Sequence, residues 1–105
     1  MVTAKVIKDQ SGYVSFSASG HAVFEEKGRD IVCSAISVLT VNTANSIMTF
    51  TDTKIETFEN DGFLSWKFTD GCGREATLLM DSMILGLRSI VEQYDKYLTL
   101  YVEEV

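Results

Sequence analysis

The chain has 105 residues and a mass of 11.7 kDa, which is enough for one small domain and too short for two. Hydrophobic residues make up 46% and charged residues 23%, a globular composition that excludes a disordered chain. Nine Lys and Arg against fifteen Asp and Glu give a net charge of −6, so nucleic acid is not expected as a partner, whereas a basic protein or peptide is.

The first ten residues, MVTAKVIKDQ, lack the apolar core of a signal peptide, and no stretch approaches the roughly twenty apolar residues that a membrane span requires. We therefore expect a cytoplasmic protein with no membrane partner. Cys33 and Cys72 are too few for a disulfide framework and should be free thiols in a reducing compartment. Their spacing from the one histidine, His21, matches no zinc signature, so no metal site is expected.

The first elements are predicted to be two strands joined in a hairpin. Residues 2–8 and 13–19 are rich in β-forming residues and flank the turn-forming run DQSG. Apolar side chains at every second position of the second strand should face the core, because alternation is typical of a half-buried strand. These side chains are Val14, Phe16 and Ala18.

A polar segment without periodicity, residues 20–30, follows this hairpin and is expected to be a mobile loop bounded by Gly20 and Gly28. Asp30 is a preferred N-cap residue, and apolar residues at helical spacing predict a helix from there to about Phe50. Its predicted buried face comprises Ile31, Ala35, Val38, Leu39, Asn42 and Ile47.

The second half of the chain repeats the order of the first. Residues 54–59 and 63–68 flank the turn-forming run NDG and predict a second hairpin. A second helix is predicted over 74–94 and a last strand over 97–104. The apolar stripe of this second helix is Leu79, Met83, Leu87, Ile90 and Tyr94. The order ββαββαβ predicts a single α+β domain over 1–105, with two helices packed on a mostly antiparallel sheet.

One thiol and one imidazole are the candidates for chemistry. With Asp30 as N-cap, Cys33 would be the third helical residue, where the helix dipole and unpaired N–H groups stabilise a thiolate. The charge of Asp30 acts in the opposite direction. An imidazolium at His21 would stabilise the thiolate and could then protonate a leaving amine. Ser37 lies one turn after Cys33 on the same helix face, so its hydroxyl could bond within a cleft.

Each of these residues also has a purely structural interpretation. Cys33 lies in an apolar helical stretch, where a cysteine can be a small core residue. Asp30 can be a plain helix cap, and Ser37 can bond back to its own helix. Cys72 lies between two glycines in a turn and is most simply an exposed, incidental thiol. The residue pattern alone leaves these alternatives open.

A resemblance adds to this pattern. Residues 20–22 read GHA, and residues 28–37 read GRDIVCSAIS after a short glycine-containing loop. This order resembles the ribosomal-processing cysteine protease family Prp, as do the later run LGLRSI and the paired tyrosines near the C-terminus. The likeness spans nearly the whole chain. It implies Cys33 as nucleophile and His21 as general acid/base, with supporting positions at Asp30, Ser37, Gly20 and Gly28.

The resemblance also implies a substrate and a state of association. Members of the family remove a short N-terminal extension from bacterial large-subunit ribosomal protein number twenty-seven by cutting after an aromatic pair. They form homodimers and need no cofactor. Backbone N–H groups at the start of the Cys33 helix would stabilise the oxyanion. A basic ribosomal substrate agrees with the acidic charge of the chain.

Two other functions remain open at this point. The first is a non-catalytic, ribosome-associated assembly factor whose cleft holds a peptide without cutting it. The second is a thiol redox protein that uses Cys33 and Cys72, although the chain has no C-x-x-C motif. In the protease interpretation, the loop between His21 and Cys33 should close on a basic peptide through Glu25 and Glu26.

Overall fold

The computed structural model of the chain describes residues 1–20, 29–60 and 62–105, with residues 29 and 30 described by their backbone alone. Five strands and two helices follow one another in the predicted order ββαββαβ. They are β1 (Val2–Asp9), β2 (Gly12–Ser19), α1 (Arg29–Phe50), β3 (Ile55–Asn60), β4 (Phe63–Phe68), α2 (Arg74–Gln93) and β5 (Leu98–Glu104). Every predicted strand and helix is therefore present, with bounds within two residues of those expected.

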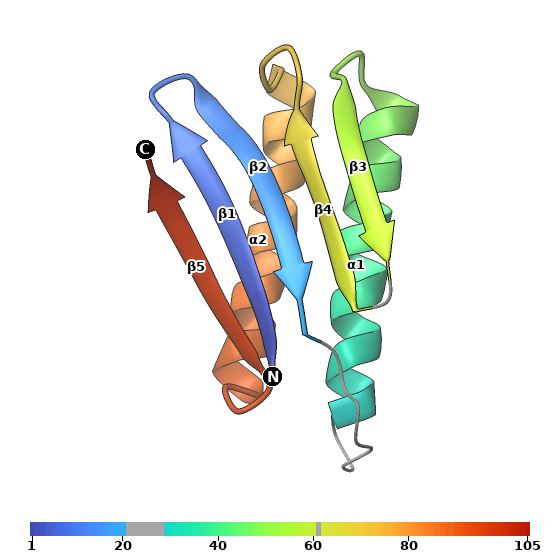
Figure 1. Cartoon of the computed structure of the whole chain (residues 1–105), viewed down its shortest axis with the longest axis vertical. Helices are drawn as coiled ribbons and strands as arrows, with labels where there is room; N and C mark the ends of the chain where they lie inside the picture. Colours follow the sequence, from blue (N-terminus) through green and yellow to red (C-terminus); the bar gives the residue numbers. More distant parts are fainter. Residues whose placement is uncertain (21–28, 61) are drawn as a thin grey trace.

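All five strands form one sheet in the order β3-β4-β2-β1-β5 (Figure 1). Neighbouring strands are antiparallel except for β1 and β5, which are parallel. Parallel neighbours need a long crossover, and helix α2 precedes β5 on its return to the edge of the sheet beside β1. The predicted α+β architecture with a mostly antiparallel sheet is confirmed.

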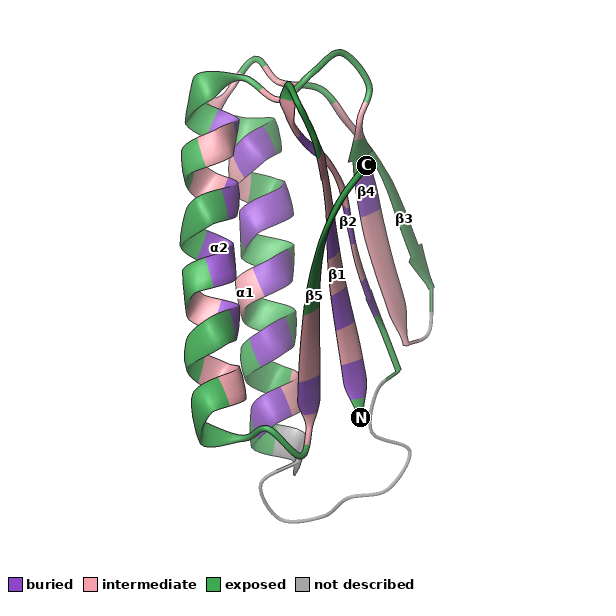
Figure 2. Cartoon of the chain, turned by 90° about the vertical axis from the view of Figure 1, so that its left-hand side faces the viewer, coloured by how far each residue is buried: buried purple, intermediate pink, exposed green. Residues whose placement is uncertain are grey.

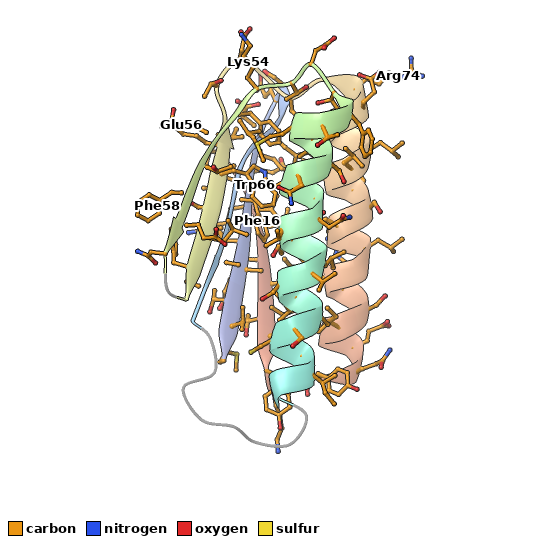
Figure 3. All side chains as sticks on the ribbon, turned by 90° about the vertical axis from the view of Figure 1, so that its right-hand side faces the viewer. Phe16, Lys54, Glu56, Phe58, Trp66 and Arg74 are labelled. Carbon is orange, nitrogen blue, oxygen red and sulfur yellow. The ribbon has the colours of Figure 1, made fainter. Side chains whose placement is uncertain are left out.

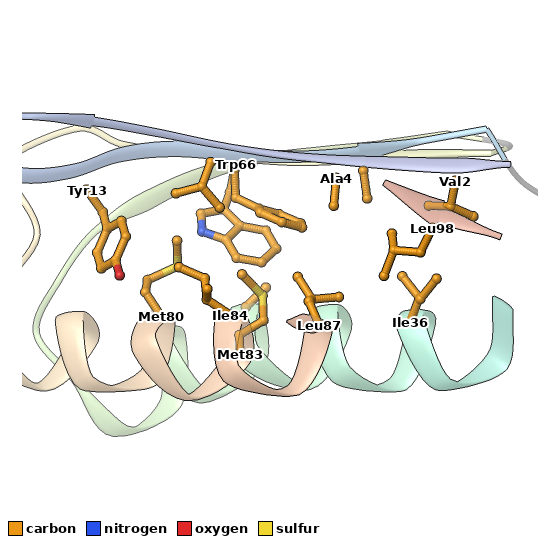
Figure 4. Close-up of a cluster of buried hydrophobic side chains, with 14 of the residues drawn as sticks. Val2, Ala4, Tyr13, Ile36, Trp66, Met80, Met83, Ile84, Leu87 and Leu98 are labelled. Carbon is orange, nitrogen blue, oxygen red and sulfur yellow. The ribbon is translucent and has the colours of Figure 1, made fainter. Parts of the chain in front are cut away.

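Both helices cover the same face of the sheet, and the other face is open (Figure 2). The core lies between these two layers, where Trp66 is 1% exposed and its ring centroid is 4.7 Å from that of Phe16 (Figure 4). The helices approach closely at Gly86, where an added Cβ would lie 2.7 Å from Leu39 Cδ2. This close approach accounts for a glycine inside a helix.

The face predicted for α1 is only partly right, because Ile47 is buried and Leu39 half-buried, whereas its other four residues are exposed. Ile31 and Val38 are 67% and 70% exposed, and Ala35 and Asn42 are exposed as well. The helix is rotated so that two threonines enter the core instead, which is possible because their hydroxyls donate to carbonyls one turn back in the helix. The buried residues of α1 are Val32, Ile36, Thr40, Thr43, Ala44 and Ile47.

The face of α2 is predicted more accurately. Met83 and Leu87 are fully buried, Leu79 and Ile90 are half-buried and pack against the core, and Tyr94 is exposed rather than buried. The apolar stripe also takes in residues that the prediction omits, namely Ala76, Met80 and Ile84.

The alternation predicted for β2 fails at its first residues. Phe16 and Ala18 are buried as expected, but Tyr13 is buried and Val14 is only half-buried. A β-bulge is the reason, because the register shifts between Ile7 and Lys8, whose partners are Ser15 and Tyr13. Val14 is the extra residue, and an extra residue reverses which side chains face the core.

Helix α1 also corrects the expectation that no stretch could cross a membrane. By length and composition the segment Ile31–Phe50 is long and apolar enough to do so, with a mean hydropathy of 1.5. A core helix satisfies the same criterion, and α1 packs its buried face against the sheet and α2. The absence of a membrane partner stays a prediction.

Candidate active site

A pocket of about 250 Å³ lies between helix α1 and the sheet. One wall is formed by α1, another by the end of β2, and a third by the tip of the β3–β4 hairpin. These segments meet because β2 and β4, which are far apart in the sequence, pair with each other and bring Ser19 opposite Phe63. The α1 residues in the wall are Cys33, Ile36, Ser37, Thr40 and Val41, whose spacing defines one face of the helix.

Cys33 is half-buried and packs against the core at its inner side. Within the described residues helix α1 runs from Arg29, so Asp30 is a helical residue and not the N-cap. Cys33 is therefore at least the fifth helical residue and not the third, and its own N–H falls within the regular i→i−4 bonding of the helix. The predicted position of the thiol close to the helix start is right, but the position at the third residue is wrong.

Ser37 lies in the same pocket as Cys33, as their one-turn spacing predicts. Its side chain is exposed to the pocket, and the hydrogen bonds between described residues include none from its hydroxyl. Thr40, one turn further into the pocket, is 2% exposed and donates to the carbonyl of Ile36 at 2.8 Å. The Thr40 hydroxyl is therefore satisfied within the helix, whereas that of Ser37 bonds to none of the described residues and faces the pocket.

Gly20 fixes the chain at the mouth of the pocket. Its φ of +81° suits glycine, and its N–H donates to the carbonyl of Gly62 at 3.0 Å. An added Cβ would lie only 2.7 Å from the carbonyl oxygen of Met1. That carbonyl cannot easily retreat, because the N–H of the same peptide unit, on Val2, donates to the carbonyl of Tyr97 at 2.8 Å.

His21 and Gly28 lie outside the described residues, as does the predicted loop between them. Asp30 is described by its backbone alone, so the geometry shows neither its carboxylate nor the imidazole beside Cys33. Among the described residues no group of three or more His, Cys, Asp or Glu side chains could hold a metal ion. The roles of His21, Gly28 and Asp30 stay predictions.

Cys72 is in a different environment from Cys33. It lies in the connection between β4 and α2, at the opposite end of the molecule from the start of α1 (Figure 1). Cys72 is half-buried rather than exposed as predicted, and its sulfur is 3.3 Å from the Thr77 hydroxyl. Burial raises the pKa of the Cys72 thiol, the Thr77 hydrogen bond lowers this pKa, and the charge of Asp81 raises it.

The tip of the β3–β4 hairpin is the part of the site that the sequence pattern did not indicate. Glu59, Asn60, Phe63 and Leu64 line the pocket opposite α1. No local motif marks them, because their position depends on the pairing of β4 with β2. A pocket with a half-buried thiol, an exposed serine hydroxyl and walls that mix apolar and polar side chains can bind a peptide and present its backbone to the sulfur.

The family model described as cysteine protease Prp matches residues 1–99 of the chain. The chain belongs to this family. It is a cysteine protease, as the resemblance in residues 20–37 predicted. The ribosomal processing cysteine protease Prp of Staphylococcus aureus strain Mu50 is 28% identical over 103 residues, which cover 95% of this chain and 97% of that protein.

Two solved structures from S. aureus have the same architecture. The ribosomal processing protease Prp in complex with a substrate peptide has a TM-score of 0.91 and 25% identity, and it covers 98% of this chain and 100% of that chain. The same protease with a covalently linked product peptide has a TM-score of 0.88 and 26% identity over the same shares of the two chains. The two-layer fold described above is thus that of a peptide-binding protease.

Proposed function

We propose that this protease removes the short N-terminal extension of bacterial large-subunit ribosomal protein number twenty-seven, with Cys33 as nucleophile and His21 as general acid/base. The observation that carries the proposal is the position of Cys33 in the pocket between α1 and the β3–β4 hairpin. The names of the S. aureus relatives support a ribosomal substrate for this chain.

The choice of Cys33 over Cys72 follows from their environments. A cysteine protease needs a thiolate that a peptide can reach, and the chain has only these two thiols. Cys33 lines the pocket, whereas Cys72 lies away from it and has a pKa raised by burial. A disulfide requires Cα atoms within about 7 Å, and two thiols at opposite ends of a molecule 40 Å long do not support a redox pair.

In the proposed mechanism the Cys33 thiolate attacks the scissile carbonyl and forms a tetrahedral intermediate. The imidazolium of His21 gives its proton to the departing amine, which leaves a thioester on the sulfur. Water, deprotonated by the same imidazole, hydrolyses this thioester and releases the thiolate. Because the N–H of Cys33 is bonded within α1, the oxyanion donors would be backbone N–H groups at the start of α1, which precede Cys33 in the chain.

The acidic charge of the chain supports a basic substrate. Ribosomal proteins bind RNA and are therefore rich in Lys and Arg, and a net charge of −6 attracts such a partner. We place the reaction in the cytoplasm, where ribosomes are assembled, and assign no cofactor to it, because cysteine hydrolysis needs only thiolate, imidazole and water.

We also propose that the protease is a homodimer that pairs through the outer face of its two helices. Three α1 residues of the predicted face, Ile31, Ala35 and Val38, instead form an exposed apolar stripe, with Ile31 67% and Val38 70% exposed. Leu78 and Leu85 of α2, seven residues apart on one helix face, are 69% and 70% exposed. Ile90 joins Val38 in the lining of a largely apolar hollow between the helices, which a second copy could fill.

The substrate proposal is tested by incubating the protein with ribosomal protein number twenty-seven carrying its extension and weighing both proteins by intact-mass spectrometry. Loss of the extension at one peptide bond is the expected result. A substrate that binds but keeps its full mass would instead favour the non-catalytic assembly factor, and a substrate that neither binds nor changes mass would refute the proposal.

A further inference from the structure

The pocket extends along helix α1 as a short groove. Its α1 wall extends from Cys33 to Val41, eight residues later. At 1.5 Å per helical residue this wall is about 12 Å long. An extended peptide advances about 3.3 to 3.6 Å per residue, so the wall spans three to four substrate residues counted from the sulfur.

Glu59 is the one carboxylate among the described residues that line this groove, and none of those residues is a cation. Its side chain faces the helix layer, because Glu59 pairs with Leu64 across the hairpin and partners directly opposite share a face. The same strand shows the other orientation at Glu56, whose partner is Lys67 and whose side chain points away from the helices (Figure 3).

Glu59 is exposed on the edge strand β3, and its charge is not neutralised by the described residues. The ion pair found between described residues joins Lys5 and Glu103, on β1 and β5. The other described residues of the groove wall are uncharged, and the large apolar side chains among them include Ile36, Phe63 and Leu64. A carboxylate at the rim of such a groove is placed to bind one cationic side chain.

We propose that Glu59 is a specificity residue that binds a Lys or Arg side chain of the substrate within about four residues of the scissile bond. The inference rests on the proposed function, and it adds a charge requirement to a groove that is otherwise uncharged among the described residues. Ribosomal proteins supply such side chains at high density, so one acidic contact at the groove selects them over neutral sequences of the same apolar character.

The test compares peptides that span the cleavage site and differ at one position only. Each pair of peptides carries Lys in one member and Gln in the other at one of the four positions on either side of the scissile bond. The ratio of kcat/KM for the two peptides is measured for the parental protein and for Glu59→Gln, Glu59→Lys and Glu56→Gln. The parental protein should prefer Lys at one of these positions by about fivefold, the range of a partly exposed ion pair. The preference should weaken as the salt concentration rises.

Glu59→Gln should bring this ratio to about one, and Glu59→Lys should reverse it, so that a peptide with Glu at that position is cleaved faster. Glu56→Gln makes the same charge change on the opposite face of β3 and should keep the fivefold preference. A Lys preference that persists in Glu59→Gln, or an equal loss of kcat/KM for both peptides, would overturn the proposal. A charge that points inward on an edge strand can also prevent that strand from pairing with another molecule. A Glu59→Gln protein that aggregates but keeps its preference for the Lys peptide would show this role instead and would overturn the proposal.

The outcome is separable from that of the proposed function. If the parental protein cuts no peptide of the series, the substrate proposal fails, and the affinities of the Lys and Gln peptides for Cys33→Ala are measured by calorimetry. A Lys preference in binding that disappears on adding Glu59→Gln would still support the role of Glu59. Equal affinities for the two peptides would refute it.

Discussion

Replacing Gly20 by alanine should destabilise the protein and impair its active site together. An alanine with φ near +81° costs about 1–2 kcal/mol relative to glycine. Its Cβ would also lie 2.7 Å from the carbonyl oxygen of Met1, and relieving such a contact costs about 1–3 kcal/mol. Alanine also lowers the conformational entropy of the unfolded chain, which stabilises the folded state by about 0.4–1 kcal/mol. We therefore expect a loss of about 2–3 kcal/mol in unfolding free energy.

Gly71→Ala is the matched control for this change. Gly71 has a similar φ of +76°, but an added Cβ there would meet no atom within 4 Å. This variant should lose about 1 kcal/mol, the conformational cost alone. Denaturant unfolding followed by the fluorescence of Trp66, the single tryptophan, measures both variants at one protein concentration.

The two variants should differ even more in activity. Gly20 lines the pocket and directly precedes His21, so a shift of its backbone displaces the predicted general acid/base. Gly20→Ala should lower kcat/KM at least tenfold, while Gly71→Ala, in the β4–α2 connection, should leave it unchanged. Equal stabilities for the two variants, together with parental activity in Gly20→Ala, would refute the inference that the Met1 contact fixes this end of the site.

Three further outcomes follow from the structure. At pH 7.5 iodoacetamide should modify Cys33 faster than Cys72, because burial raises the pKa of the Cys72 thiol and limits access to its sulfur; peptide mapping of the labelled sites measures both rates. Burial and the hydrogen bond to Asp81 raise the pKa of Tyr13. The stabilisation that Tyr13 gives the fold is therefore complete below about pH 10, the pKa of an unfolded tyrosine, and is lost as the pH rises further. The unfolding free energy of Tyr13→Phe should not show this decrease at alkaline pH. Val38→Asp should place a charge in the proposed dimer interface. The mass measured by light scattering should then fall from about 23 kDa, twice the 11.7 kDa of one chain, to that of the monomer. A parental protein that is itself monomeric would contradict the dimer.

The order of the elements was predictable because short runs of neighbouring residues mark where each strand and helix begins and ends. Glycine and Asp/Asn clusters mark both hairpin turns, and alternation marks the inner face of β4, where Leu64, Trp66 and Phe68 point to the core. The path of the sheet was less accessible. Pairing of β2 with β4 and of β1 with β5 depends on contacts between distant residues, which periodicity does not report.

The errors at α1 and β2 share a physical origin. The buried face of a helix is predicted from the positions of its apolar residues alone. Such a prediction omits Thr40 and Thr43, which can be buried because their hydroxyls form hydrogen bonds within the helix. Likewise, strict alternation assumes an uninterrupted ladder, and the bulge at Val14 breaks it. In both cases the local pattern was overridden by how the element docks on the sheet.

About half of the candidate site could be predicted. The spacing of Cys33 and Ser37 places them on one helix face, and the structure brings them into one pocket. Gly20 joins them there, although its contact with Met1 could not be foreseen, because the two residues meet only when β1 and β2 pair. Glu59 was missed for the same reason, since it reaches the pocket through the β3–β4 hairpin.

The most direct measurement of the central claim is the cleavage of the extended ribosomal protein by Cys33→Ala and by Cys72→Ala, followed by intact mass. Cys33→Ala should leave the extension in place while its thermal unfolding stays within a few degrees of the parental protein, because the thiol is half-buried and contributes little packing. Cys72→Ala should cleave at the parental rate. Cleavage by Cys33→Ala, or its loss in Cys72→Ala alone, would contradict the assignment of the nucleophile.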